Sequence, residues 1–193
     1  MIGWDPAFPT SVSPLTTVSL FLGKSTTSLH LRRRCALTME AAVQILQRAL
    51  AMRSPLENLT LFTEPQTDPK YNSAILASLN ALQRLEILCV STTLVSPGLL
   101  DVLRHLPMLR ALTFDNVTSP IAIESEVWGP LSAAAAQGGA DFRMMKQLEL
   151  HQVSISNVSH LFDQHRSILG RLTKLEIHLP VQYTAKPSNA QVR

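Results

Sequence analysis

A short apolar pattern recurs along this chain at nearly constant spacing. Two leucines stand three residues apart, with methionine replacing the first in one copy, and a further apolar residue follows two positions later. The copies are Leu56-Leu59-Leu61, Leu82-Leu85-Ile87, Leu109-Leu112-Phe114, Met145-Leu148-Leu150 and Leu172-Leu175-Ile177, preceded by an incomplete copy, Leu29-x-Leu31. Their middle residues, 29, 59, 85, 112, 148 and 175, are separated by 30, 26, 27, 36 and 27 residues. Such a period predicts stacked units, none of which buries its hydrophobic face alone.

Each unit contains two hydrophobic periodicities. The alternating apolar residues of the motif predict a short strand. Between motifs the spacing is helical: residues 39–52 place Ala42, Val43, Leu46, Ala49 and Leu50 on one stripe, with Thr38 as N-cap. Further helices are expected at 71–79, 98–106 and 156–169. The sequence therefore predicts an α/β leucine-rich-repeat solenoid, a curved parallel sheet of about six strands with helices on the convex face.

The repeats suggest three segments. Residues 15–180 form the predicted solenoid, and the 36-residue step locates an irregular insertion at about 118–142. Residues 1–14 and 181–193 are polar and contain prolines, so we expect disordered tails.

Bulk properties limit the function classes. The formal net charge is only +3, so nucleic-acid binding is not expected without a clustered basic patch. No apolar run approaches the roughly 18 residues of a membrane span, and the first residues lack a secretory signal pattern. Cys35 and Cys89 are expected about 10 Å apart, two strand spacings, whereas a disulfide needs Cα atoms within about 7 Å. Reduced thiols favour an intracellular location, cytoplasm or nucleus.

Two groups of residues resemble parts of a phosphate-binding loop and of a metal or hydrolytic site, but neither meets the requirements of such a site. Gly23-Lys24-Ser25-Thr26 looks like the end of a phosphate-binding loop, but the required glycine five residues earlier is Val18. Asp115, His151 and His178 fall on consecutive predicted strands, and the outer pair would lie roughly 10 Å apart, too far for one metal ion. In the predicted register, no Ser or Cys lies in the same column of outward strand positions, so a histidine there has no nucleophile to activate. The sequence therefore predicts neither an enzyme nor a cofactor or metal site.

The outward positions of the strands form the expected concave binding surface of a solenoid. With the motif aligned as above, Phe62 and Leu88 point outward on neighbouring strands, as an exposed apolar hot spot or as a patch covered by another part of the chain. Arg84, Glu86, Asp115 and His151 complete the predicted partner-binding set.

These motifs resemble the helix-containing repeats of the ribonuclease-inhibitor-like superfamily, and most of all the divergent repeats of fungal F-box/leucine-rich-repeat proteins. The resemblance covers roughly residues 15–180 and implies a substrate-holding surface, as in a ubiquitin ligase of the SCF type. In that family an N-terminal F-box docks onto an Skp-type adaptor. Residues 1–14 are too short for an F-box, so direct adaptor binding is not expected.

Two alternatives remain open. Some helical leucine-rich-repeat proteins are GTPase-activating proteins, and regulation of a small GTPase would use an exposed residue such as Arg34 or Asn116. The other hypothesis is a non-autonomous fragment of a larger leucine-rich-repeat protein, because solenoid ends need polar caps and the sequence contains no convincing capping repeat.

Overall fold

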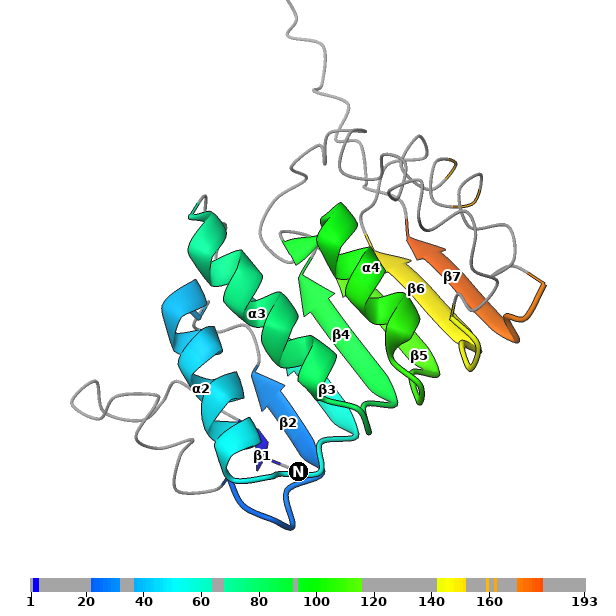
Figure 1. The fold of residues 1–193 in the computed structure, drawn as a ribbon. Helices are drawn as coiled ribbons and strands as arrows, with labels where there is room; N and C mark the ends of the chain where they lie inside the picture. The colour runs from blue at the N-terminus through cyan, green and yellow to red at the C-terminus, as the bar shows by residue number, and fades with distance from the viewer. Residues whose placement is uncertain are drawn as a thin grey trace, which may run out of the picture.

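Parallel strands lie side by side in chain order and form one seven-stranded sheet, with helices along one face (Figure 1). The computed structural model describes residues 2–3, 22–31, 37–63, 68–91, 94–115, 142–151, 159, 162 and 170–178. The strands are β1 (Ile2–Gly3), β2 (Ser28–Leu31), β3 (Asn58–Leu61), β4 (Ile87–Ser91), β5 (Ala111–Asp115), β6 (Gln147–His151) and β7 (Lys174–His178). The helices are α2 (Met39–Ala51), α3 (Pro69–Ala81) and α4 (Pro97–His105). The predicted α/β repeat architecture is confirmed.

The sheet begins earlier than the sequence suggested. Ile2 pairs with Leu29 and Gly3 with His30, so β1 adds a short parallel strand beside β2. These two residues lie within the segment expected to be a disordered tail, and for them that expectation is wrong. Backbone pairing to an edge strand needs no apolar repeat, so the repeat motif does not predict this strand.

Each described helix begins at a side chain that caps its first turn. The Thr38 hydroxyl accepts a hydrogen bond from the Ala41 N–H at 3.2 Å at the start of α2. Asp68 accepts from the Lys70 N–H at 2.9 Å before α3, and Ser96 accepts from the Leu99 N–H at 3.2 Å before α4. These bonds satisfy amide groups that have no partner within the helix. No helix in the described ranges is long and apolar enough to cross a membrane.

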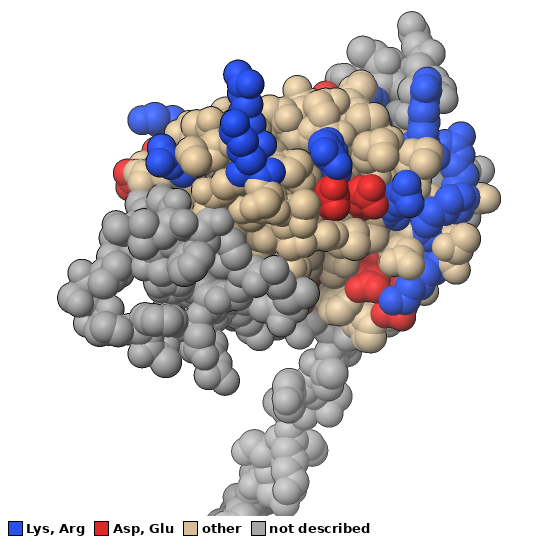
Figure 2. Space-filling model, turned by 90° about the horizontal axis from the view of Figure 1, so that it is seen from below, with Lys and Arg blue, Asp and Glu red and all other residues tan. Residues whose placement is uncertain are grey.

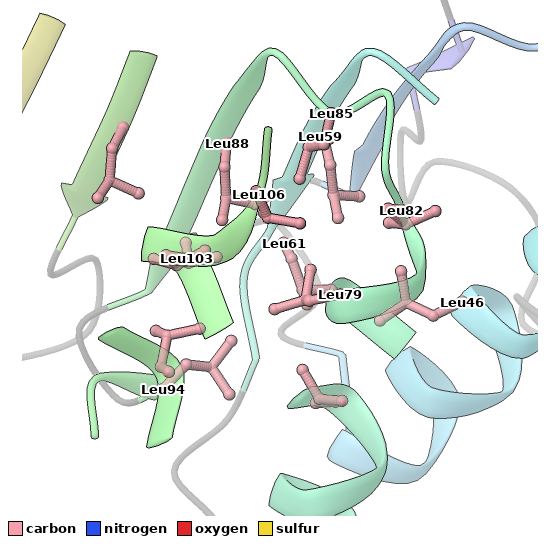
Figure 3. Close-up of a cluster of buried hydrophobic side chains, with 14 of the residues drawn as sticks. Leu46, Leu59, Leu61, Leu79, Leu82, Leu85, Leu88, Leu94, Leu103 and Leu106 are labelled. Carbon is pink, nitrogen blue, oxygen red and sulfur yellow. The ribbon is translucent and has the colours of Figure 1, made fainter. Parts of the chain in front are cut away.

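The core consists of two rows of side chains that run across the sheet beneath the helices. The rows are Leu29, Leu59, Leu88, Leu112 and Leu148, and Leu31, Leu61, Val90, Phe114 and Leu150. None of these residues is more than 3% exposed. Figure 3 shows three of them, Leu59, Leu61 and Leu88, facing helical leucines. These include Leu46, Leu79 and Leu103, which are fully buried. Burial of each leucine contributes about 1.5–3 kcal/mol, so the repeated motif supplies the main stabilisation.

The motif copy predicted at Leu82-Leu85-Ile87 is displaced by three residues in the structure. Leu88, not Leu85, pairs with Leu59, and Val90 pairs with Leu61. Leu85 takes the place of Leu56 before the strand, so the motif reads Leu85-Leu88-Val90. Side chains alternate along a strand, and this register places Leu88 and Val90 in the two core rows where the predicted register placed Leu85 and Ile87. Leu85 remains buried before the strand, Ile87 becomes exposed, and the expectation that Leu88 is exposed is wrong.

A backbone hydrogen-bond ladder fixes this register at the amino-terminal ends of the strands. The Glu57 carbonyl accepts bonds from the Glu86 and Ile87 N–H groups at 2.8 and 2.9 Å. The carbonyls of Glu86, Arg110 and Lys146 each accept two bonds from the next unit in the same way. Residues directly before the strands are therefore held in a row as regular as the sheet itself.

Candidate functional site

The sheet face opposite the helices, called here the open face, carries the candidate site. No helix of the described ranges lies on it (Figure 1). Its side chains form three rows: Ser28, Asn58, Ile87, Ala111, Gln147 and Lys174; His30, Thr60, Cys89, Thr113, Glu149 and Glu176; and, from β4 to β7, Ser91, Asp115, His151 and His178. Neighbouring strands lie about 4.8 Å apart, so residues next to each other in a row are within side-chain reach.

The predicted partner-binding residues divide into three groups. Asp115 and His151 lie on the open face, and the half-exposed Phe62 directly follows β3. Leu88 lies in the core and cannot contact a partner. Arg84 and Glu86 precede β4 and lie at the amino-terminal edge of the sheet, because the shifted register removes them from the strand. Whether the exposed members bind a partner stays a prediction.

Ile87 occupies the position that the sequence assigned to the core. It is 47% exposed in the central strand β4, between Asn58 and Ala111 in the first row. Cys89 stands two residues further along the same strand. An isoleucine of this exposure in the middle of a sheet gives the open face an apolar centre. The sequence signal for this placement is the apolar pair Leu88 and Val90. Burial of this pair in the core turns Ile87 to the opposite side of the strand.

Hydrogen bonds connect the side chains at the β2–β3 end of the open face. Asn58 Nδ2 donates to Ser28 Oγ at 3.0 Å, and His30 Nδ1 lies 2.8 Å from Thr60 Oγ1. The side chains of these pairs are an amide, two hydroxyls and one imidazole, with no carboxylate or ammonium group among them. They hold the polar rows in place across two strands without adding a strong electrostatic preference.

A charged cluster occupies the β5–β7 end. The Lys174 ammonium lies 2.6 Å from Glu149 Oε1 and 3.1 Å from Glu176 Oε1, and Thr113 Oγ1 donates to Glu149 Oε2 at 3.3 Å. The hydrogen bond to Glu149, followed by that to Glu176, raises the pKa of Lys174. The hydrogen bond from Lys174 lowers the pKa of Glu176. The cation is therefore shared between two carboxylates on adjacent strands.

Two histidines extend this cluster. The ring centroids of His151 and His178 are 4.5 Å apart. His151 Nδ1 lies 4.0 Å from Asp115 Oδ1, and its Nε2 lies 3.8 Å from Glu149 Oε2. Both separations exceed hydrogen-bond length, and Nε2 is buried without a hydrogen-bond partner. Three carboxylates, Asp115, Glu149 and Glu176, stand at this end with one lysine, Lys174, which contacts Glu149 and Glu176. Carboxylates therefore outnumber ammonium groups on this part of the open face.

The arrangement lacks the geometry of common reactive sites. In the described ranges no group of three or more His, Cys, Asp or Glu residues is placed to hold a metal ion. The corrected register brings Ser91 into the third row, contrary to the expectation of no Ser or Cys there. Ser91 neighbours Asp115, however, and His151 lies a further strand away, roughly 9.6 Å from the serine's strand. A serine nucleophile needs its histidine base within hydrogen-bond reach.

A surface depression of about 410 Å³ opens between the turns that follow α2 and α3. Leu50, Leu56 and Leu82 supply apolar walls, and Arg53 and Ser54 line the same space. The Ser54 hydroxyl is buried and has no hydrogen-bond partner. The depression lies away from the open face and contains no pair of groups suited to acid–base chemistry.

The architecture matches a solved structure. The chain is similar to the tropomodulin C-terminal domain of Caenorhabditis elegans, with a TM-score of 0.53 and 11% identity, over 82% of this chain and 95% of that chain. The chain has a leucine-rich-repeat-like fold. At this identity the similarity establishes the fold alone. No protein-family model matches the sequence, and no curated protein does either.

Several sequence expectations fall on residues that the structure does not describe. They include Cys35, the insertion at about 118–142 and the tail 181–193, together with all but two residues of the helix expected at 156–169. Arg34 and Asn116, the residues considered for regulation of a GTPase, are also outside the described ranges. These expectations remain untested.

Proposed function

We propose that this solenoid is a protein-binding module and that its partner docks on the open face. The observation that carries the proposal is Ile87, an exposed apolar side chain in the central strand, flanked by a polar and charged surface. Protein interfaces commonly combine an apolar anchor with a polar rim that excludes water. Phe62, half-exposed after the neighbouring strand, provides a second apolar contact.

Charge indicates the chemistry of the partner. Asp115, Glu149 and Glu176 face Lys174 and two histidines at the β5–β7 end. Because three carboxylates outnumber one lysine when the imidazoles are neutral, the partner would place lysine or arginine side chains there. Complementary charge of this kind fixes orientation and increases the association rate. The apolar contact at β4 would supply most of the affinity.

The finer form of the proposal is recognition of a substrate protein for a ubiquitin ligase of the SCF type. It is supported by the resemblance of the repeats to those of F-box/leucine-rich-repeat proteins. Binding, not catalysis, is the proposed activity, because the described part of the open face presents an exposed apolar residue, Ile87, among rows of polar and charged recognition groups.

The test compares affinity capture by the wild-type chain with capture by two double variants. Phe62→Ser with Ile87→Ser removes the apolar contacts of the open face. Leu175→Ser with Ile177→Ser removes two comparably exposed apolar side chains outside it, on the opposite side of β7. Mass spectrometry identifies the captured proteins, scored in particular for an Skp-type adaptor and a cullin, and circular dichroism verifies the fold of each variant.

The expected result is one or more proteins lost from the open-face variant and retained by the matched control. Because hot-spot truncations typically cost about 2 kcal/mol or more, the loss should be at least about thirtyfold in affinity. Equal capture by the open-face variant would refute the proposed site. Loss from the Leu175/Ile177 control alone would move binding to the opposite side of β7. Capture of an adaptor and a cullin would support the ubiquitin-ligase form. Captured proteins whose ubiquitination in cells does not depend on this chain would refute that form while leaving the binding face intact.

A further inference from the structure

The amino-terminal edge of the sheet forms a second surface, perpendicular to the open face. Two rows of residues define it. The first row directly precedes the strands and contains Glu57, Glu86, Arg110, Lys146 and Thr173. The second row lies two residues earlier and contains Pro55, Arg84, Met108, Met144 and Arg171. The backbone ladder described above holds the first row in register from β3 to β7.

An ion pair shows that side chains of the two rows meet. Arg84 in the second row lies 2.9 Å from Glu57, which precedes the neighbouring strand in the first row. Arg84 belongs to the unit that follows the unit of Glu57. The same offset of one unit matches Met144 with Arg110 and Arg171 with Lys146. The two rows therefore make one surface, and its character changes along the sheet.

Charge on this edge reverses between β4 and β5. The first row is acidic at Glu57 and Glu86 and basic at Arg110 and Lys146. Arg143 and Arg171 are also exposed at the basic end, where Figure 2 shows Lys and Arg side chains gathered on the β5–β7 side of the molecule. Arg110 lies 3.9 Å from Glu86, too far for a close pair. Arg143 and Lys146 form no ion pair with any carboxylate of the described residues.

Two exposed methionines lie in the second row, Met144 within the basic part of the edge and Met108 at its border with Glu86. Met108 is 37% exposed and Met144 is 40% exposed, at equivalent positions of consecutive units. Methionine and arginine are both enriched in protein interfaces, where the flexible thioether adapts to varied apolar partners. An exposed apolar pair inside a basic surface calls for a ligand that is acidic and apolar at once.

We propose that this edge, beneath β5–β7, binds an acidic amphipathic helix of a partner protein. Strands repeat every 4.8 Å or so, and carboxylates one turn apart on a helix repeat about every 5–6 Å. Glutamates at such positions would therefore face Arg110 and Lys146 in succession. Leucines on the adjoining stripe of the helix would cover Met108 and Met144.

The same observations disfavour extended polyanions. No aromatic side chain is exposed on the described part of this edge, so nucleic-acid bases would lack stacking partners. Glu57 and Glu86 continue the edge beyond Arg110 and would repel a long phosphate backbone or an anionic membrane plane. A helix of a few turns fits within the basic part alone.

Fluorescence anisotropy tests the proposal with a labelled synthetic helix of about 18 residues, roughly five turns, carrying glutamates and leucines one turn apart on adjoining stripes. A scrambled peptide of the same composition, anionic phospholipid vesicles and single-stranded RNA are the comparison ligands. Arg143→Glu with Lys146→Glu reverses the basic edge. Lys24→Glu with Arg48→Glu makes the same change of charge at exposed positions elsewhere. Met108→Ser with Met144→Ser removes the apolar contacts.

The amphipathic peptide should bind at least about tenfold more tightly than its scrambled form, and the edge charge reversal should weaken binding by about tenfold or more. The methionine variant should also bind more weakly, and the Lys24/Arg48 control should change little. Equal binding of the scrambled peptide, or equal loss in the control, would reduce the effect to net charge and overturn the proposal. Tighter binding of RNA or vesicles would overturn it in favour of those ligands. Ile87→Ser should leave peptide affinity unchanged, so this surface can fail or succeed independently of the open face.

Discussion

Replacement of Leu88 by alanine tests the register of β4, on which the open face depends. In the structure Leu88 is fully buried, and its neighbour Ile87 is 47% exposed. The motif register read from the sequence alone makes the opposite assignment. The paired variants Leu88→Ala and Ile87→Ala therefore distinguish the two registers with almost the same chemical change.

The expected magnitudes differ severalfold. Leu88→Ala deletes three buried carbon atoms at about 0.8 kcal/mol each, which gives about 2.4 kcal/mol for transfer. The cavity left between α3, α4 and the sheet adds to this, so the total should be about 3–4 kcal/mol, within the range of buried leucine truncations. Ile87→Ala loses roughly half of the same transfer term and leaves no enclosed cavity, so about 1 kcal/mol is expected.

Chemical denaturation followed by far-UV circular dichroism measures both variants against the wild type. The midpoint should shift strongly for Leu88→Ala and slightly for Ile87→Ala, with the same denaturant dependence in each. In thermal unfolding, the Leu88 variant should melt roughly 6–16 °C lower, from the scale of about 2–4 °C per kcal/mol for a chain of this size. A larger loss for Ile87→Ala than for Leu88→Ala would refute the register and with it the assignment of Ile87 to the open face.

Three further substitutions test separate features. Thr38→Ala removes the cap of α2 and should cost about 1 kcal/mol in denaturant unfolding, with Thr38→Ser retaining most of the stability; no difference between the two would contradict the capping role. Ser54→Ala removes a buried hydroxyl without a hydrogen-bond partner, so it should be neutral or stabilising by up to about 1 kcal/mol, and a clear destabilisation would mean that the hydroxyl is bonded. Lys174→Met should raise the pKa of Glu176 in an NMR titration, because the hydrogen bond from Lys174 holds it below 4.5. In the wild type the stabilisation from this lowered pKa is complete above about pH 4.5 and is lost as the pH falls through the folded-state pKa, so the stability gap between the variant and the wild type should narrow in acid; an unchanged Glu176 pKa would contradict the pairing.

Most of the fold was accessible from the sequence because the repeat carries redundant signals. Five of the six motif strands were aligned correctly, and Thr38 marked the start of α2. The failure at β4 has a specific cause. Leu82, Leu85, Ile87, Leu88 and Val90 satisfy the apolar motif in two registers, and spacing alone favoured the wrong one. The choice is decided by which side chains the core buries, and that depends on the strands on either side.

The candidate site depended on this single choice more than the fold did. A shift of three residues reverses the facing of every side chain in β4, since strand side chains alternate. It sends Leu88 to the core, brings Ile87 to the open face and leaves Arg84 and Glu86 at the edge. The predicted Asp115 and His151 were unaffected, because β5 and β6 contain only one register of the motif. The contacts of Lys174 with Glu149 and Glu176 were beyond sequence reasoning, since side-chain conformation determines which carboxylates one lysine reaches.

Each repeat contributes to both proposed surfaces, and this makes their coupling measurable. In the β6 unit, Lys146 lies at the basic edge while Glu149 and His151 lie on the open face. Opposite charges are thus separated by only a few residues along the chain and point in perpendicular directions. If two partners bind independently, Ile87→Ser should weaken only the partner of the open face, and the Arg143/Lys146 charge reversal should weaken only the partner of the edge. Weakening of a single captured partner by both substitutions, with effects that add because the sites share no contact, would show that one protein spans the edge and the open face together, using the acidic and basic halves of the same repeats.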